Sequence, residues 1–203
     1  MPTSIEHTDL PMENFARSLT VALGERDNNT RMHSDRVVQL STELGCHIHL
    51  SERELEVLIL GAQFHDIGKI GIPDNVLSKP AAFEASEWAV MKQHPLIGER
   101  IVLALGSERS PEIALVVRHH HENFNGTGYP DGLAGTDIPL YARIISLADN
   151  YDAMAVARPY HKARRHQDVM NILHSESGIK HDPDLLHAFC KVIEKSEMRD
   201  SDD

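Results

Sequence analysis

Histidine is the residue type whose number and placement in this sequence could support chemistry. The chain has 14 histidines among 203 residues, together with 31 acidic and 20 basic side chains. Imidazole is the commonest metal ligand in proteins and the side chain that titrates nearest neutral pH. An acidic chain rich in histidine therefore indicates metal binding. The alternative is a set of histidines scattered over the surface, and their positions decide between the two.

Two carboxylates lie where a metal ion could use them. Asp66 directly follows His65 at the end of an apolar helical segment, so both groups can meet one ion, and a carboxylate can bridge two. Asp149 follows the apolar run 144–148. A buried carboxylate needs a compensating positive charge, because its burial without one costs several kcal/mol. An arginine or lysine would compensate Asp149 as well as a metal, and a lone His-Asp pair is more often an exposed helix end.

Further histidines lie at helix ends or on core-facing positions. His33 lies one turn before Val37, and His94 precedes Pro95, which is expected to push it off the helical backbone. The run 119–121 ends another helix. Consecutive helical residues point about 100° apart, so two of these three rings can face one ion if the helix end frays. Each alone is more often a core or surface histidine, but five candidate places on five different helices favour one shared site.

The elements that must position these groups are helices almost throughout. Apolar residues recur with helical spacing in several stretches, near 31–44, 51–63, 88–105 with a break at Pro95, 110–117, 139–148, 169–173 and 185–193. Ser51 with Glu54 forms a capping box. No segment alternates with period two, so the fold class expected is all-α. The glycine-rich stretch 125–135 predicts an ordered loop.

Length and composition predict one domain and exclude several functions. We expect a flexible N-terminal segment at residues 1–14, one domain at 15–195 and a charged C-terminal tail at 196–203. The formal charge of −11 argues against a nucleic-acid polymer or an anionic membrane as the main partner. No apolar run is long enough to span a membrane, and the start lacks a secretory signal. Two isolated cysteines favour the cytoplasm.

The order and content of the motifs resemble the HD-GYP family of bacterial phosphodiesterases. The two main matches are the segment 65–74, His-Asp-Ile-Gly-Lys-Ile-Gly-Ile-Pro-Asp, followed by Lys79-Pro80, and His120-His121-Glu122 followed by the segment 125–133, Asn-Gly-Thr-Gly-Tyr-Pro-Asp-Gly-Leu. Further matches are Arg26-Asp27, Thr30, His33-Ser34, Arg36-Val37, Gln93-His94-Pro95, Ile138-Pro139, Ala142-Arg143-Ile144, Ala148-Asp149, Tyr151-Asp152-Ala153, Arg158-Pro159-Tyr160 and Asp182-Pro183. They run in family order from about residue 25 to 190.

The resemblance implies a single HD-type helical bundle with a central binuclear metal site and an ordered Gly-Tyr-Pro loop. The implied metal ligands are His33, His65, Asp66, His94, His120, His121 and Asp149. Asp66 would bridge two divalent ions, one held also by His33, His65 and Asp149, the other by His94, His120 and His121. His119 is interpreted as a non-ligand. Imidazole and carboxylate also suit zinc, nickel or cobalt, but the family favours iron or manganese.

The activity that the resemblance implies is hydrolysis of cyclic di-GMP to pGpG, and to GMP in some relatives, in bacterial second-messenger signalling. Asp66 and Lys69 are the expected catalytic residues, and Lys69 would neutralise a phosphate oxygen. Arg158 would hold the second phosphate, beside His161. The loop residues Gly126, Gly128, Tyr129 and Pro130 are expected to serve recognition. Tyr129 could stack on guanine or meet a partner protein, or it merely packs the loop onto the core.

Departures from the family pattern bear on metal number and affinity. Asn29 stands where some members have a glutamate for a third metal, so a two-metal site is expected. Asn125 replaces an aspartate that often opens the loop, Ala81 replaces a usual glycine, and His161 stands at a position that is often basic. The adjacent Lys162 would compensate for His161, or substrate affinity is lower.

Two other functions remain open at this point. One is a non-catalytic or weakly catalytic module that binds a cyclase (GGDEF) domain through the Gly-Tyr-Pro loop. The other is a phosphodiesterase for a hybrid cyclic dinucleotide. No expected ligand is eroded, which disfavours the module, whereas the loop does not separate cyclic di-GMP from a hybrid substrate. The sequence leaves the oligomeric state open.

Overall fold

The chain folds as a helical bundle in the computed structural model, which describes residues 12–26, 28–156 and 163–199. The helices in order are α1 Met12–Gly24, α2 Asn28–His47, α3 Glu52–Phe64, η1 Ile67–Gly71, α4 Asp74–Leu77, α5 Ala85–Met91, α6 His94–Ala104, α7 Ser110–His119, η2 Gly135–Asp137, α8 Leu140–Ala155, α9 His166–Ser175 and α10 Pro183–Ile193. These residues form no strand, only the isolated bridges Asn125–Ala134 and Ser177–His181. The all-α prediction is confirmed.

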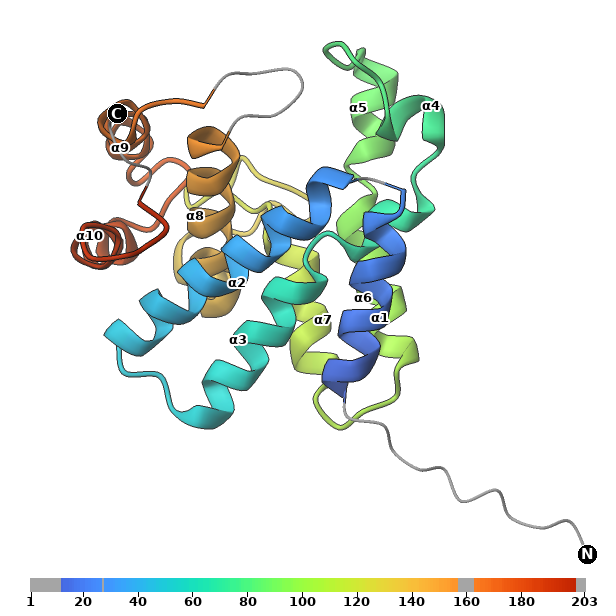
Figure 1. Cartoon of the computed structure of the whole chain (residues 1–203), viewed down its shortest axis with the longest axis horizontal. Helices are drawn as coiled ribbons and strands as arrows, with labels where there is room; N and C mark the ends of the chain where they lie inside the picture. The colour runs from blue at the N-terminus through green and yellow to red at the C-terminus, as the bar shows by residue number, and fades with distance from the viewer. Residues whose placement is uncertain (1–11, 27, 157–162, 200–203) are drawn as a thin grey trace, which may run out of the picture.

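Two packed groups of helices meet at the centre of the molecule (Figure 1). Helices α2 and α3 form an antiparallel pair, α8 packs against α2, and α9 and α10 lie beyond α8. On the other side α6 packs on α7 and η1, and α7 packs on α3. The short helices α4 and α5 project at one end of the bundle. The hydrophobic core runs through all the long helices, with Leu58, Val117 and Ile145 fully buried.

Local sequence explains where the helices begin. The Ser51 capping box is present, with the Ser51 side chain accepting from the Glu54 backbone N–H and the Glu54 carboxylate accepting from the Ser51 N–H. Pro111 lies in the first turn of α7, where a proline removes no intrahelical hydrogen bond. Pro139 precedes α8 at its N-cap. These starts agree with the sequence-based expectation.

Two elements differ from expectation. Helix α1 begins at Met12, inside the stretch expected to be a loose N-terminal segment, because Leu23 is buried in the core and Leu19 packs against it. His94 was expected to leave the helical backbone ahead of Pro95, but it is the first residue of α6. A proline is tolerated in the first turn of a helix, so His94 and Pro95 can both belong to the start of α6. The break between α5 and α6 therefore lies earlier than expected, at residues 92–93.

Candidate metal centre

The seven predicted ligands come from five long helices and the turn after α3. His33 is on α2, His65 ends α3, Asp66 precedes η1, His94 begins α6, His120 and His121 follow α7, and Asp149 is on α8. All seven line or border the middle of the bundle. His33, His65, His94 and His120 are each buried there to 5% exposure or less. Helices distant in sequence therefore bring the candidate ligands together, as predicted.

A histidine–carboxylate cluster forms between α2, α3 and α8. His33 Nε2 lies 3.0 Å from Asp149 Oδ1, and His65 Nε2 lies 3.4 Å from Asp66 Oδ2. One candidate ligand atom from each of His33, His65 and Asp66 lies within 4.8 Å of the others. Mixed imidazole and carboxylate ligands at this spacing suit a divalent transition metal.

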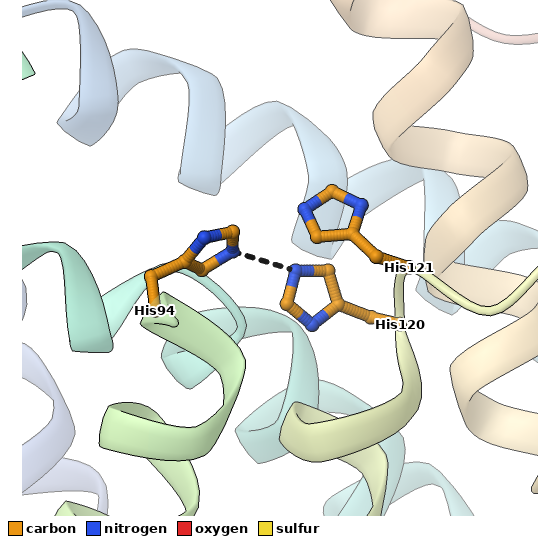
Figure 2. A group of neighbouring side chains, drawn as sticks. All are labelled: His94, His120 and His121. Carbon is orange, nitrogen blue, oxygen red and sulfur yellow. Dashed lines mark hydrogen bonds between the residues drawn. The ribbon is translucent and has the colours of Figure 1, made fainter. Parts of the chain in front are cut away.

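A second cluster consists of three histidines. Figure 2 shows the rings of His94, His120 and His121 turned toward one another from the start of α6 and the end of α7. Candidate ligand nitrogens of the three rings lie within 4.8 Å of one another. His94 Nε2 is also 3.6 Å from Asp66 Oδ1, the carboxylate oxygen that does not face His65. Asp66 thus lies between the two clusters, one oxygen toward each, in the place that a bridging ligand needs.

The hydrogen bonds of the rings prepare them to bind a cation. The Nδ1 atoms of His65, His94 and His120 lie 2.7, 2.9 and 2.7 Å from the carbonyl oxygens three residues before them. A carbonyl only accepts, so each Nδ1 carries the proton and each neutral ring has a bare Nε2. Metal-ligating histidines commonly make this kind of bond with the ring nitrogen that does not bind the metal.

Two features of these rings then have no explanation in hydrogen bonding. His94 Nε2 and His120 Nε2 are 3.3 Å apart, and two bare nitrogens repel at that distance (Figure 2). The contact is a hydrogen bond only if one ring is doubly protonated. His65 Nε2 is buried without a hydrogen-bond partner. A bound cation satisfies both observations, because it accepts all of these lone pairs. The residues present therefore fit a metal.

The pKa shifts in the site favour neutral rings for His94, His120 and His121 and an ionised Asp66 carboxylate. Burial lowers the pKa of His94 to about 3 and of His121 to about 4, and lowers that of His120 well below its usual value. Burial alone would raise the pKa of Asp66, but the Lys69 ammonium and the neighbouring histidines hold it well below its usual range. Neutral imidazoles around an ionised carboxylate are the forms that bind metals.

Asp152, to which the sequence assigned no role, contacts the ring nitrogen of His33 that does not face Asp149. His33 Nδ1 lies 2.6 Å from Asp152 Oδ2, and Arg36 Nε donates to Asp152 Oδ1 at 2.5 Å. Burial opposes the charged form of His33, but hydrogen bonds to Asp149 and Asp152 raise its pKa to about 9. Such carboxylate–histidine pairs orient a ligand ring and increase its basicity. The signal available in the sequence was the spacing of Asp149 and Asp152 on α8, because residues three apart lie on the same face of a helix.

A cavity of about 310 Å³ opens over the two clusters. It is lined by His33, Asp66, Lys69, Leu77, Phe83, Trp88, Met91, His94, His121, Tyr129, Asp149 and Ala153. Lys69 Nζ donates to Asp66 Oδ2 at 2.6 Å, so the predicted catalytic pair is in contact. Tyr129 stacks on His121 with ring centroids 5.0 Å apart. Burial raises the pKa of Tyr129, which keeps its hydroxyl protonated.

The Gly-Tyr-Pro loop is fixed by the helix end that carries the histidines. Glu122 is buried and accepts hydrogen bonds from the backbone N–H groups of Asp131 and Gly132, at 2.7 and 3.0 Å. A Cβ on Gly128 would lie 2.2 Å from the backbone nitrogen of Asn123, so only glycine allows this approach. Glu122 is a second supporting residue to which the sequence assigned no role. The loop is ordered, as predicted.

His119 faces away from the two clusters. Its Nε2 lies 2.9 Å from Asp131 Oδ2, and its Nδ1 lies 2.8 Å from the Leu115 carbonyl oxygen. Arg118 donates to both oxygens of the same Asp131, at 2.7 and 2.8 Å. His119, Glu122 and Asp131 could together hold an ion by distance. The ring nitrogens of His119, both oxygens of Asp131 and Glu122 Oε1 already make hydrogen bonds, most of which fasten the loop, whereas Glu122 Oε2 is buried without a hydrogen-bond partner. The interpretation of His119 as a non-ligand stays a prediction.

Several residues named from the sequence cannot be placed here, among them Lys162 and the Arg158-Pro159-Tyr160 match. Arg158 and His161, the expected phosphate contacts, lie outside the described residues, as does the side chain of Asn29. Their roles stay predictions. Among the described helices, none is long and apolar enough to cross a membrane.

Comparison with known sequences identifies what the chain is similar to. A family model described as an HD domain matches residues 16–185. The cyclic di-GMP phosphodiesterase response regulator RpfG of Xanthomonas campestris pv. campestris is 37% identical over 85% of this chain and 46% of its own length. A cyclic di-GMP phosphodiesterase of Thermotoga maritima is 38% identical over 82% of this chain and 45% of its own length. The chain thus spans less than half the length of these relatives.

Comparison with solved structures supports the same architecture. The crystal structure of a cyclic GMP-AMP specific phosphodiesterase of V. cholerae, V-cGAP3, superposes with a TM-score of 0.67 at 20% identity. The match covers 89% of this chain and 48% of the other. At that identity the likeness establishes the fold, an HD-type helical bundle.

Proposed function

This chain belongs to the HD domain family, in its HD-GYP branch, and on that basis we propose that it is a metal-dependent phosphodiesterase that hydrolyses cyclic di-GMP. The relatives named above for this activity cover most of the chain. The observation that carries the proposal is Asp66, whose two oxygens face two separate histidine clusters beneath one cavity. A carboxylate shared between two sites is the arrangement that a two-metal phosphodiesterase needs.

The proposed cofactor is a pair of divalent ions, iron or manganese. His33, His65 and Asp149 would hold one, His94, His120 and His121 the other, with Asp66 shared. When bound, two such ions lower the pKa of a water and offset charge on the phosphate oxygens. Zinc, nickel and cobalt also accept these ligands. The expected count is two because Asn29 replaces a glutamate.

The chain's own residues position and neutralise the substrate. Lys69, now paired with Asp66 at 2.6 Å, is proposed to donate to a phosphate oxygen at the mouth of the cavity. Arg158 is proposed to hold the second phosphate, with His161 nearby. Asp152 and Arg36 keep His33 oriented from behind. The first product is pGpG, and GMP follows if the linear product is cleaved again.

The Gly-Tyr-Pro loop is proposed to serve recognition. Gly126, Gly128 and Pro130 set its shape, and Tyr129 presents a ring to the cavity. A Tyr129→Ala variant is expected to keep its metal and its melting temperature while substrate or cyclase-domain binding weakens. A large fall in melting temperature with unchanged binding would show that Tyr129 only packs the loop.

A bacterial cytoplasmic setting is proposed because both cysteines, Cys46 and Cys190, are free thiols. A cyclase (GGDEF) domain is a proposed partner through the loop. A role as a non-catalytic module is the weaker alternative, since all seven ligand positions hold metal-binding side chains. Six of them form the two clusters, and the seventh, Asp149, lies beside His33.

The test is metal-dependent turnover by protein purified without oxygen, with metal content measured. Cyclic di-GMP and the hybrid cyclic GMP-AMP are supplied in parallel, and products are separated by chromatography. We expect about two ions per chain and cleavage of cyclic di-GMP to pGpG. Asp66→Ala is expected to abolish metal binding and turnover, whereas Asp168→Asn, in an exposed ion pair with Arg165, serves as the matched control. Metal-loaded protein that cleaves neither compound would contradict the proposal, and faster cleavage of the hybrid would reassign the substrate.

A further inference from the structure

We propose that Phe83, Trp88 and Tyr129 form an aromatic wall on which a purine base of the substrate stacks. The inference rests on the proposed function, because it names what holds the base once the phosphate lies over the metal ligands. The three rings line the same cavity as His33, Asp66 and Asp149. They come from the segment before α5, from α5 itself and from the Gly-Tyr-Pro loop.

The rings form a continuous series leading outward from the metal centre. Tyr129 stacks on the candidate ligand His121 at a centroid distance of 5.0 Å. Trp88 meets Tyr129 edge to face at 6.1 Å, and Phe83 stacks on Trp88 at 6.1 Å. Adjacent rings in this series therefore support one another, and an aromatic surface begins at the metal ligands.

The burial of Trp88 indicates that it is not there for packing alone. Its side chain is 44% exposed, although tryptophan is the largest apolar side chain. It belongs to neither of the two buried hydrophobic clusters among the described residues, whereas Phe83 packs at the edge of the smaller one. Phe83 stacks on the ring and Tyr129 meets it at a steep angle, but the remaining exposed area of Trp88 lies at the wall of the cavity, where a flat ligand can reach it.

The lining of the cavity contains both kinds of group that a nucleotide needs. Charged and ligating groups, with Lys69 beside Asp66, share it with the three rings, Leu77 and Met91. A cyclic dinucleotide has a charged phosphodiester next to a flat purine. Stacking tolerates any base, because every base has a π face. The wall therefore binds purines without separating guanine from adenine, and guanine selection must come from other contacts.

The chain offers a built-in reporter, because Trp88 is its single tryptophan. Manganese-loaded protein is titrated with cyclic di-GMP, with GMP and with inorganic phosphate while tryptophan fluorescence is recorded. Saturable quenching by both nucleotides, and none by phosphate, is expected. In parallel, kcat, KM and metal content are measured for Trp88→Ala, Trp88→Phe and the control Leu103→Ala, an equally exposed apolar residue on α6 outside the cavity.

Trp88→Ala is expected to raise KM by about tenfold or more, the range that loss of one stacking ring produces, with kcat and metal content unchanged. Trp88→Phe should recover most of the loss, and Leu103→Ala should match the parent. An unchanged KM in Trp88→Ala, or equal losses in Trp88→Phe and Trp88→Ala, would overturn the wall. If the parent cleaves no cyclic di-GMP, the proposed function fails. The fluorescence titration alone then tests whether a purine stacks on the aromatic wall, and absence of quenching by the nucleotides would contradict that stacking.

Discussion

Replacing Asp152 by asparagine tests whether the proposed metal centre depends on residues that orient its proposed ligands. Asp152 is 2% exposed and joins α8 to α2 by accepting from His33 Nδ1 at 2.6 Å and from Arg36 at 2.5 and 3.1 Å. Asparagine has nearly the same shape but one acceptor oxygen, and its NH₂ group would face a donor. Either His33 or Arg36 therefore loses its partner.

The expected size of the effect follows from these bonds. Loss of such a supporting partner typically weakens metal binding about 10- to 100-fold, or about 1.4–2.7 kcal/mol. A lost hydrogen bond to a charged group costs about 1.5–3 kcal/mol of stability. The Arg36 side chain is 24% exposed and is partly rehydrated, so about 2 kcal/mol is expected. For a chain of this size, that lowers the melting temperature by roughly 4–8 °C.

The assay combines chelator competition, which gives metal affinity, with calorimetry of the metal-free and metal-loaded protein. Asp168→Asn is the matched control, because its ion pair with Arg165 has partners 48% and 75% exposed and should change stability by less than about 0.5 kcal/mol. If Asp152→Asn melts lower but binds metal with the parent's affinity, Asp152 supports only packing and the reasoning about His33 is refuted.

Three further outcomes are expected. Gly68→Ala places a Cβ 1.8 Å from the His94 carbonyl oxygen, so it should displace the start of α6. Both the melting temperature and the metal content should fall. Normal metal content in that variant would show that the backbone can shift there without disturbing the site. Lys69→Ala should keep its metal and lower kcat at least about tenfold, and metal analysis beside turnover checks both. Hydrogen bonds from Arg118 hold the pKa of Asp131 below its usual value, so the stabilisation is present above about pH 4 and is lost as the pH falls further. Asp131→Asn should therefore destabilise by less than about 1 kcal/mol at pH 7, because solvent screens the pair, and by less still at pH 3 in denaturant titrations.

The sequence was sufficient for the fold class and for the candidate ligands that the fold brings together, because both depend on local patterns. Helical spacing and the capping box at Ser51 act over a few residues, and the candidate ligands lie within recognisable motifs. The role of Asp152 depends on which faces of α2 and α8 meet, a tertiary property that spacing does not fix. The aromatic wall was equally hidden, because Trp88 and Tyr129 belong to separate segments that meet only in the folded chain. Helix α1 was missed although Phe15, Leu19 and Leu23 lie at helical spacing in the sequence.

The contact between His33 and Asp152 spans 119 positions of the chain. During synthesis, α2 leaves the ribosome long before α8, so His33 exists for a time without Asp149 or the supporting carboxylate of Asp152. Domains generally fold as units once their chain has emerged. Loading of the proposed metal site is accordingly expected to be a late, post-synthetic event, and a nascent chain that stops before Leu140 should retain none of the ion that His33 is proposed to hold. Metal supply would then determine how much finished protein is active without changing how much is made.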